Sequence, residues 1–167
     1  LARGDVDAIT GFYFTSLLNL NARGIKDEDV DVMMYPKYGV NLYGNAIIVS
    51  EQFLKEKPEA VKAFLRAFTK GMKDVLADPD ASIKFVKERD ALVDETLEKR
   101  RMKLAIESVI VTPEAKADGL GAVQPARLND MVTQVSSAFE LKNPVKADAI
   151  FNSSFLPAKA DRMVFPK

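Results

Sequence analysis

A run of glycine, aromatic and hydroxyl side chains near the start of the chain has the chemistry of a ligand-contacting loop. It follows the apolar segment 6–10 and contains Thr10, Gly11, Phe12, Tyr13 and Thr15. An aromatic ring can stack on a flat ligand and a hydroxyl group can donate a hydrogen bond, and loops that leave the strands of an α/β sheet commonly face a ligand crevice. The alternative is an aromatic cluster that packs in the core beside a turn, and the residues alone leave both interpretations open.

The 167 residues contain no Cys and no His. They supply no thiol nucleophile, no disulfide, no zinc site of the usual ligand kind and no imidazole general base. The spacing of the other side chains does not indicate a Ser/Lys pair or a carboxylate pair, so we expect no catalytic residue. Binding a solute needs only a crevice with a few placed donors and rings, which suits this composition.

Other polar clusters are weak signals. The acidic run 27–29 lacks the spacing of a calcium loop and is interpreted as a solvated turn. The Gly-x-Gly at 119–121 lacks the third glycine and the flanking strand and helix of a dinucleotide site. The basic run 99–103 is interpreted as a solvated helix face, with a docking patch as the alternative. We therefore expect no metal site and no cofactor.

Charge and hydropathy limit the class of protein. Lys plus Arg and Asp plus Glu number 24 each, so the formal net charge is zero. No basic excess is available to neutralise a phosphate backbone, which argues against nucleic-acid binding. A hydrophobic content of 47% excludes a disordered tail. No apolar run approaches the roughly 20 residues of a membrane span.

The elements that must position the loop are expected to be strands first and helices later. Short apolar runs at 6–10, 30–34 and 46–49 predict strands. The apolar residues that recur every three or four positions after Pro58 predict a long amphipathic helix. The sequence thus predicts an α/β fold, with a few strands up to about residue 49 followed by four or five helices.

Capping signals place the helix starts. Ser50, Asp78 and Asp94 each precede an apolar-periodic segment and predict side-chain caps. Pro58 and Pro125 stand at first helical positions, where a missing N–H costs nothing.

The chain opens without an initiator Met and without a signal peptide, so we interpret it as the later part of a longer protein.

Several segments have a familiar order and spacing. Residues 4–8 read GDVDA, residues 47–54 join an apolar run to SEQFL, residues 58–67 read PEAVKAFLRA, and residues 152–157 read NSSFLP. Together these segments resemble the SsuA/THI5-like (NMT1) family of solute-binding proteins of ABC importers. The family includes binders of nitrate, alkanesulfonate, taurine and thiamine-precursor pyrimidines.

The resemblance implies a type II periplasmic-binding-protein fold, in which two α/β lobes joined by two crossing strands hold the ligand between them. This chain resembles the C-terminal portion of such a protein. Residues 1–37 would end the second lobe, residues 38–49 would form a crossing strand at the hinge, and residues 50–167 would form a helical part that packs on the first lobe and the hinge.

Carried over by position, the resemblance implies two groups of ligand-binding residues. The first group follows the segment 6–10 and comprises Thr10, Gly11, Phe12, Tyr13 and Thr15. The second group lies near the expected hinge and comprises Tyr38, Tyr43 and Asn45.

The implied function is delivery of a small organic solute to an ABC permease from the periplasm, or from a lipid anchor outside the cell. The solute classes are a thiamine-precursor pyrimidine, a sulfonate or taurine, and nitrate. Members that bind sulfonate often carry a Trp-Pro type element in the first loop, and this chain has no Trp. The loop therefore favours an aromatic or heterocyclic ligand, such as a thiamine-precursor pyrimidine. We also expect the chain to self-associate or to pair with a missing N-terminal half.

Two other functions remain open at the level of sequence. One is a ligand-sensing domain of a regulator with the same fold. The other is a pyrimidine synthase of the THI5 group, which uses His and Cys residues that these 167 residues lack.

Overall fold

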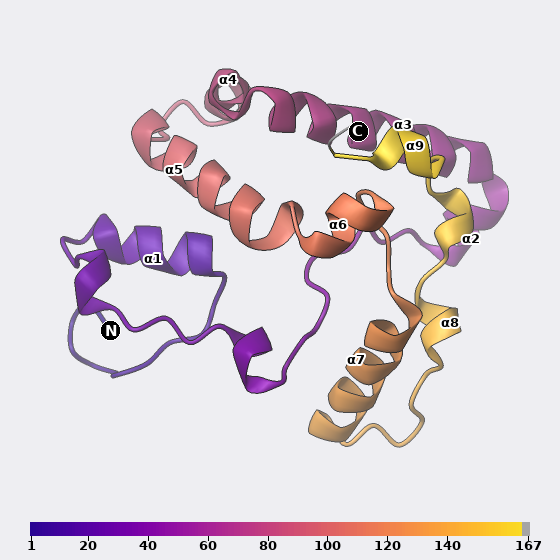
Figure 1. Cartoon of the computed structure of the whole chain (residues 1–167), viewed down its shortest axis with the longest axis horizontal. Coiled ribbons are helices and arrows are strands. Elements are labelled where there is room, and N and C mark those ends of the chain that lie inside the picture. The colour runs from indigo at the N-terminus through magenta and orange to yellow at the C-terminus, as the bar shows by residue number, and fades with distance from the viewer. Residues whose placement is uncertain (165–167) are drawn as a thin grey trace. The chain divides into compact units, whose positions relative to one another are not determined.

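The computed structural model describes residues 1–164, and the regular structure within them is entirely helical (Figure 1). Contacts divide the chain into two compact units. The first unit comprises Leu1–Met33 and Val75–Ile110, and the second comprises Met34–Asp74 and Val111–Lys167. Each unit is therefore built from two separate stretches of sequence.

The first unit is organised around α5. Its elements are α1 (Tyr13–Asn21), the 3-10 turn η1 (Asp27–Asp29), α4 (Pro79–Arg89), α5 (Glu95–Ala105) and the π-helical turn η3 (Ile106–Ile110). Both α1 and α4 pack against α5 (Figure 1). The buried apolar side chains are Leu17, Leu18 and Leu20 of α1 and Ile83 of α4. This small apolar cluster fixes the position of α1, which carries the glycine-aromatic loop at its start.

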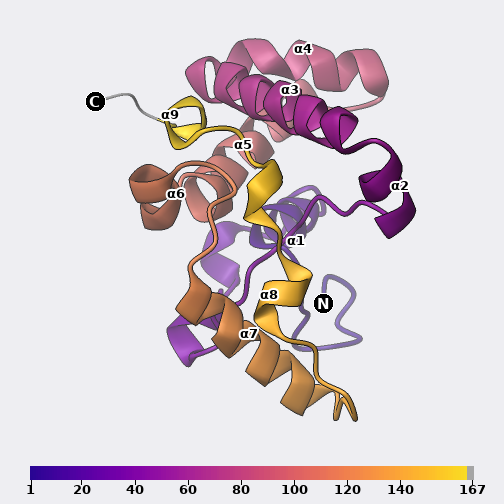
Figure 2. The same ribbon diagram turned by 90° about the vertical axis from the view of Figure 1, so that its right-hand side faces the viewer.

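The second unit contains the remaining helices. They are the 3-10 turn η2 (Tyr35–Tyr38), α2 (Glu51–Glu56), α3 (Pro58–Ala77, which begins in this unit), α6 (Pro113–Asp118), α7 (Pro125–Ala138), α8 (Ala147–Ile150), η4 (Ser153–Phe155) and α9 (Lys159–Arg162). α8 lies alongside α7 (Figure 2). Ala115, Leu128 and Val164 are the buried apolar side chains.

The predicted capping residues are confirmed. The side chain of Ser50 accepts a hydrogen bond from the Phe53 N–H at 3.2 Å, and that of Asp78 accepts one from the Ala81 N–H at 2.9 Å. Asp94 caps α5 in the same way. Each bond satisfies a donor that the helix itself leaves free, so these helices begin where the local sequence places them.

A glycine and a buried arginine join the loop after α6 to α9. The Arg162 guanidinium donates to the carbonyl oxygens of Leu120 at 2.6 Å and Pro157 at 2.9 Å, while the Leu120 N–H donates to the Arg162 carbonyl at 2.8 Å. Gly119 has φ 85° and ψ 166°, a region used almost only by glycine. A Cβ there would lie 3.0 Å from the Arg162 Cβ. The glycine therefore allows a close approach of two chain segments.

The predicted α/β fold of the type II periplasmic-binding-protein kind is wrong for the residues described, because residues 1–164 contain no strand. The three segments expected to be strands, 6–10, 30–34 and 46–49, lie outside helices but form no ladder. Their apolar side chains stay largely in solvent, and Ile48 is 90% exposed. A short apolar run predicts burial, but a strand also needs a neighbouring strand to take its backbone hydrogen bonds, and the run carries no information about that neighbour.

Candidate ligand-binding site

The aromatic loop of the first unit leads into α1. The Phe12 ring stacks on the Phe14 ring, with 5.5 Å between centroids and 23° between planes. The Phe12 carbonyl accepts hydrogen bonds from the Thr15 N–H at 3.0 Å and the Ser16 N–H at 2.8 Å. Phe12 nevertheless remains 49% exposed. The loop is thus ordered by its own backbone while part of an aromatic face remains open to solvent.

Gly11 allows the loop to turn close to α1. A Cβ built on Gly11 would lie 2.4 Å from the Ser16 Oγ, although it would be 3.7 Å from the Ser16 Cβ. A side chain at this position would therefore displace the Ser16 hydroxyl, which can rotate away. The glycine keeps that hydroxyl beside the loop.

A charged pair on α5, formed by Arg101 and Glu98, contacts the start of α1. The Arg101 guanidinium donates to the Phe14 carbonyl at 3.3 Å, and the Glu98 carboxylate accepts from the Arg101 Nε at 3.0 and 3.2 Å. No local pattern indicates this role, because Arg101 stands within a basic run that we interpreted as a solvated face. Both oxygens of Glu98 accept from one N–H of Arg101, so Glu98 holds the Arg101 side chain near the Phe14 carbonyl at the start of α1.

A second set of polar contacts in the first unit joins Arg100 of α5 to the acidic run 27–29. Arg100 donates to the Asn21 side chain at 2.9 Å and pairs with Asp27, while Asn21 also donates to Asp27 at 2.9 Å. The acidic run thus acts partly as an anchor for α5. Within residues 1–164, no group of three or more His, Cys, Asp or Glu side chains is placed to hold a metal ion.

Tyr43, a candidate of the second group, is bound into the second unit. Its hydroxyl accepts from the Gln124 N–H at 2.7 Å and donates to the Glu114 carboxylate at 3.3 Å. The Arg127 guanidinium lies over its ring, 4.1 Å from the centroid, and pairs with Glu114 at 2.9 Å. Arg127 also donates to the Leu42 carbonyl at 2.8 Å. These contacts fasten the segment around Tyr43 to α6 and α7.

Tyr38 and Asn45 are exposed in the same unit. Tyr38, at the end of η2, is 63% exposed, and Asn45 lies in the extended segment before α2. The structure therefore groups Thr10, Gly11, Phe12, Tyr13 and Thr15 around the start of α1. Of the second group it places only Tyr43 in a network, and the assignment of all eight residues to a ligand stays a prediction.

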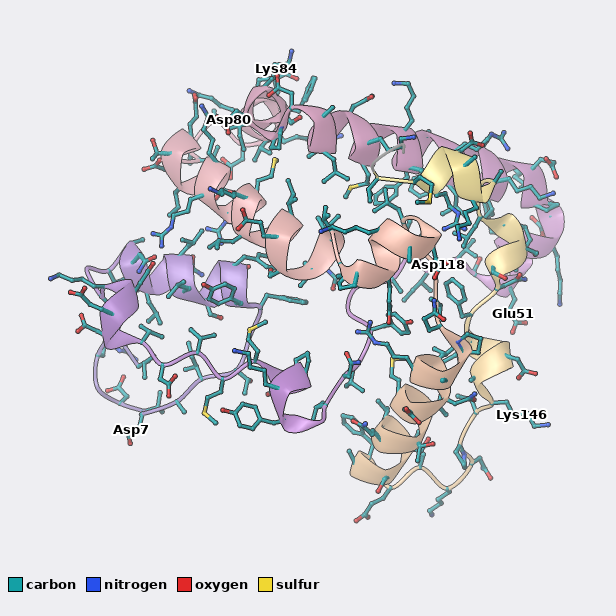
Figure 3. All side chains as sticks on the ribbon, in the orientation of Figure 1. Asp7, Glu51, Asp80, Lys84, Asp118 and Lys146 are labelled. Atoms are coloured by element: carbon teal, nitrogen blue, oxygen red, sulfur yellow. The ribbon has the colours of Figure 1, made fainter. Side chains whose placement is uncertain are left out.

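Asp118, at the end of α6, is held by two side chains of the second unit (Figure 3). It accepts from Lys159 at 2.9 Å and from the Gln124 side chain at 2.7 Å. The hydrogen bond from Lys159 and its positive charge hold the pKa of Asp118 below the usual value, against a smaller opposing effect of burial. This carboxylate links α6 to α9 and stays ionised at neutral pH.

Comparison with known proteins relates the N-terminal half of the chain to one family. Residues 1–82 match the family described as NMT1/THI5 like. These residues make up just under half of the 167-residue chain, and the similarity to the NMT1/THI5-like family applies to them. The resemblance seen in the sequence is confirmed, and all eight candidate residues lie inside the matched range.

Part of the chain is also similar to a curated protein with a named ligand. It is 32% identical over 87 residues to the riboflavin-binding protein RibY of Chloroflexus aurantiacus, a stretch that covers 50% of this chain and 24% of the relative. The chain thus spans about a quarter of that relative's length. No solved structure matches the chain. Family and relative support a solute-binding role in general and favour a binding protein over an enzyme.

No helix among the described residues combines the length and the apolar character that crossing a bilayer would require.

Proposed function

We propose that this chain is part of an extracytoplasmic solute-binding protein that delivers a flat heterocyclic solute to an ABC permease. The observation that carries the proposal is the stacked pair of Phe12 and Phe14 at the start of α1, in which Phe12 is half exposed, within the residues that match the family. Phe12 offers a half-exposed ring, and Thr10, two residues earlier in the chain, is exposed. A ring face and a nearby donor are what a flat ligand with polar edges requires.

The charge of the loop favours a heterocycle over the other solute classes. Residues 10–16 read TGFYFTS and contain no charged side chain. Nitrate and the sulfonate of taurine are compact anions, which proteins bind with arginine, lysine or convergent N–H donors. A pyrimidine or a flavin presents a flat face that an aromatic ring can cover. The riboflavin-binding relative supports the same class of solute.

The periplasm, or a lipid anchor outside the cell, is the proposed location, with the membrane permease as the proposed partner. Both follow from the family assignment. Binding without chemical change also agrees with the absence of Cys and His from the 167 residues.

A ligand panel tests the proposed solute class. The chain is titrated calorimetrically with riboflavin, a 4-aminopyrimidine, taurine and nitrate under one buffer condition. The proposal expects saturable binding of at least one of the two heterocycles, with a negative heat-capacity change because apolar surface is buried. Saturable binding of taurine or nitrate, with no heat from either heterocycle, would contradict it.

A further inference from the structure

A groove in the second unit runs between α3 and the segment that leads into α9. Its volume is about 330 Å³. Five of its lining side chains come from α3, and the four of these that carry hydrogen-bond donors are Arg66, Thr69, Lys70 and Lys73. Their spacing of three, four and seven residues places them on one face of the helix. Pro157 and Asp161 form the opposite wall.

Some polar groups of this groove already have hydrogen-bond or ion-pair partners, and others have none within residues 1–164. Lys70 pairs with Asp74 at 2.7 Å, and the Lys73 ammonium donates to the Asp161 carbonyl at 3.2 Å. Among the residues that the structure describes, Arg66 makes no side-chain hydrogen bond and no ion pair, and the Thr69 hydroxyl makes no hydrogen bond although the residue is only 9% exposed. A guanidinium with five N–H donors and a hydroxyl are thus available on one face of the helix.

The balance of charge in the groove is positive. Three cations, Arg66, Lys70 and Lys73, line it together with two carboxylates, those of Asp74 and Asp161. Lys70 compensates Asp74 directly, which leaves Arg66 and Lys73 against Asp161. An arginine fork binds two oxygens of a tetrahedral oxyanion at once, and lysines beside it add charge. The groove is therefore suited to one oxyanion.

We propose that this groove binds the phosphate group of a phosphorylated small molecule, with Arg66 as the principal contact and the Thr69 hydroxyl and Lys73 as supporting donors. The volume lies at the lower end of the range of small-molecule sites. That space exceeds the needs of a bare phosphate and accommodates a small organic group attached to it. The site consists only of second-unit residues and uses none of the eight residues predicted to contact the transported solute.

The test is a calorimetric titration of the whole chain with inorganic phosphate and with glycerol 3-phosphate, and a flotation assay with phosphatidylcholine vesicles that contain phosphatidic acid. We expect glycerol 3-phosphate to bind more tightly than inorganic phosphate. Flotation with acidic vesicles and no binding of either soluble phosphate would overturn the small-molecule proposal and assign the groove to a lipid headgroup.

Variants of groove residues test whether the phosphate compound binds in this groove. Arg66→Gln should weaken glycerol 3-phosphate binding by roughly tenfold, because it removes a charged double hydrogen bond. Asp161→Asn should strengthen binding, since it removes a carboxylate from the wall. Lys55→Gln removes one exposed cation of α2 outside the groove and should leave the affinity unchanged. Equal affinity in wild type and Arg66→Gln, or equal losses in Arg66→Gln and Lys55→Gln, would overturn the proposal.

Discussion

Tyr43 illustrates which contacts of a single residue can be predicted from the local sequence and which cannot. Its position beside glycines marked it as a ligand contact, but its hydroxyl and ring are engaged by Gln124, Glu114 and Arg127. Those partners lie 71 to 84 positions further along the chain, so no local pattern indicates them. Phe12 differs, because its neighbours are adjacent in sequence and part of its ring remains open. Local signals identified the aromatic loop but not the arginine that holds it.

The Asp118–Lys159 contact gives a pH-dependent prediction. Lys159 holds the pKa of Asp118 below its ordinary value of 3.8. Because the folded state has the lower pKa, the stabilisation is fully present above pH 3.8 and is lost as the pH falls through the lowered value. Asp118→Asn should therefore flatten the fall in Tm between pH 5 and about pH 2. Thermal unfolding followed by circular dichroism measures it.

The matched control for this prediction is Asp148→Asn on α8. Asp148 is an exposed carboxylate with no ion pair among the residues described. It should reproduce the wild-type acid limb, and an acid limb of unchanged slope in Asp118→Asn would contradict the role assigned to Lys159.

At the scale of elements, the junction between α6 and α9 depends on one glycine. Gly119→Ala should lower the free energy of unfolding by about 3 kcal/mol, because it combines a backbone conformation almost confined to glycine with a Cβ pressed against Arg162. Gly39→Ala is the control, since Gly39 has a similar φ of 86° but a left-handed ψ of 0° and open space around it. That variant should cost only about 1 kcal/mol. Urea unfolding measures both, and equal losses would contradict the account.

Helices were more predictable than strands for a physical reason. The caps at Ser50, Asp78 and Asp94 act over three residues, so the sequence alone places them. The segment 46–49 has the composition of a buried strand, but no other segment of residues 1–164 pairs with it. The packing of α1 on α5 could not be predicted for a similar reason, because it depends on residues about 85 positions apart in the sequence.

At the scale of the molecule, much apolar surface is left uncovered. On α3, Phe64 and Phe68 stack on each other with 6.1 Å between centroids, and both are exposed. Contiguous exposed apolar patches mark association surfaces. We expect the isolated chain to self-associate through this pair, which sedimentation over a range of concentrations would reveal. Phe64→Glu should shift the chain toward monomer, whereas Ala77→Glu, an equal charge on the opposite face of α3, should not.

A chain that sediments as a monomer at every concentration would contradict this expectation. Equal dissociation by Phe64→Glu and Ala77→Glu would instead show that added charge, and not the loss of the aromatic pair, disperses the assembly.

The central claim is that the half-exposed ring of Phe12, at the start of α1, stacks on a flat solute. The most direct measurement is the dissociation constant for riboflavin in three forms of the chain. Quenching of flavin fluorescence reports it. The account predicts that Phe12→Ala raises the dissociation constant roughly tenfold through the loss of ring stacking. Phe139→Ala, which removes an equally large exposed ring of the second unit, should leave it unchanged. The same affinity in wild type, Phe12→Ala and Phe139→Ala would contradict the account.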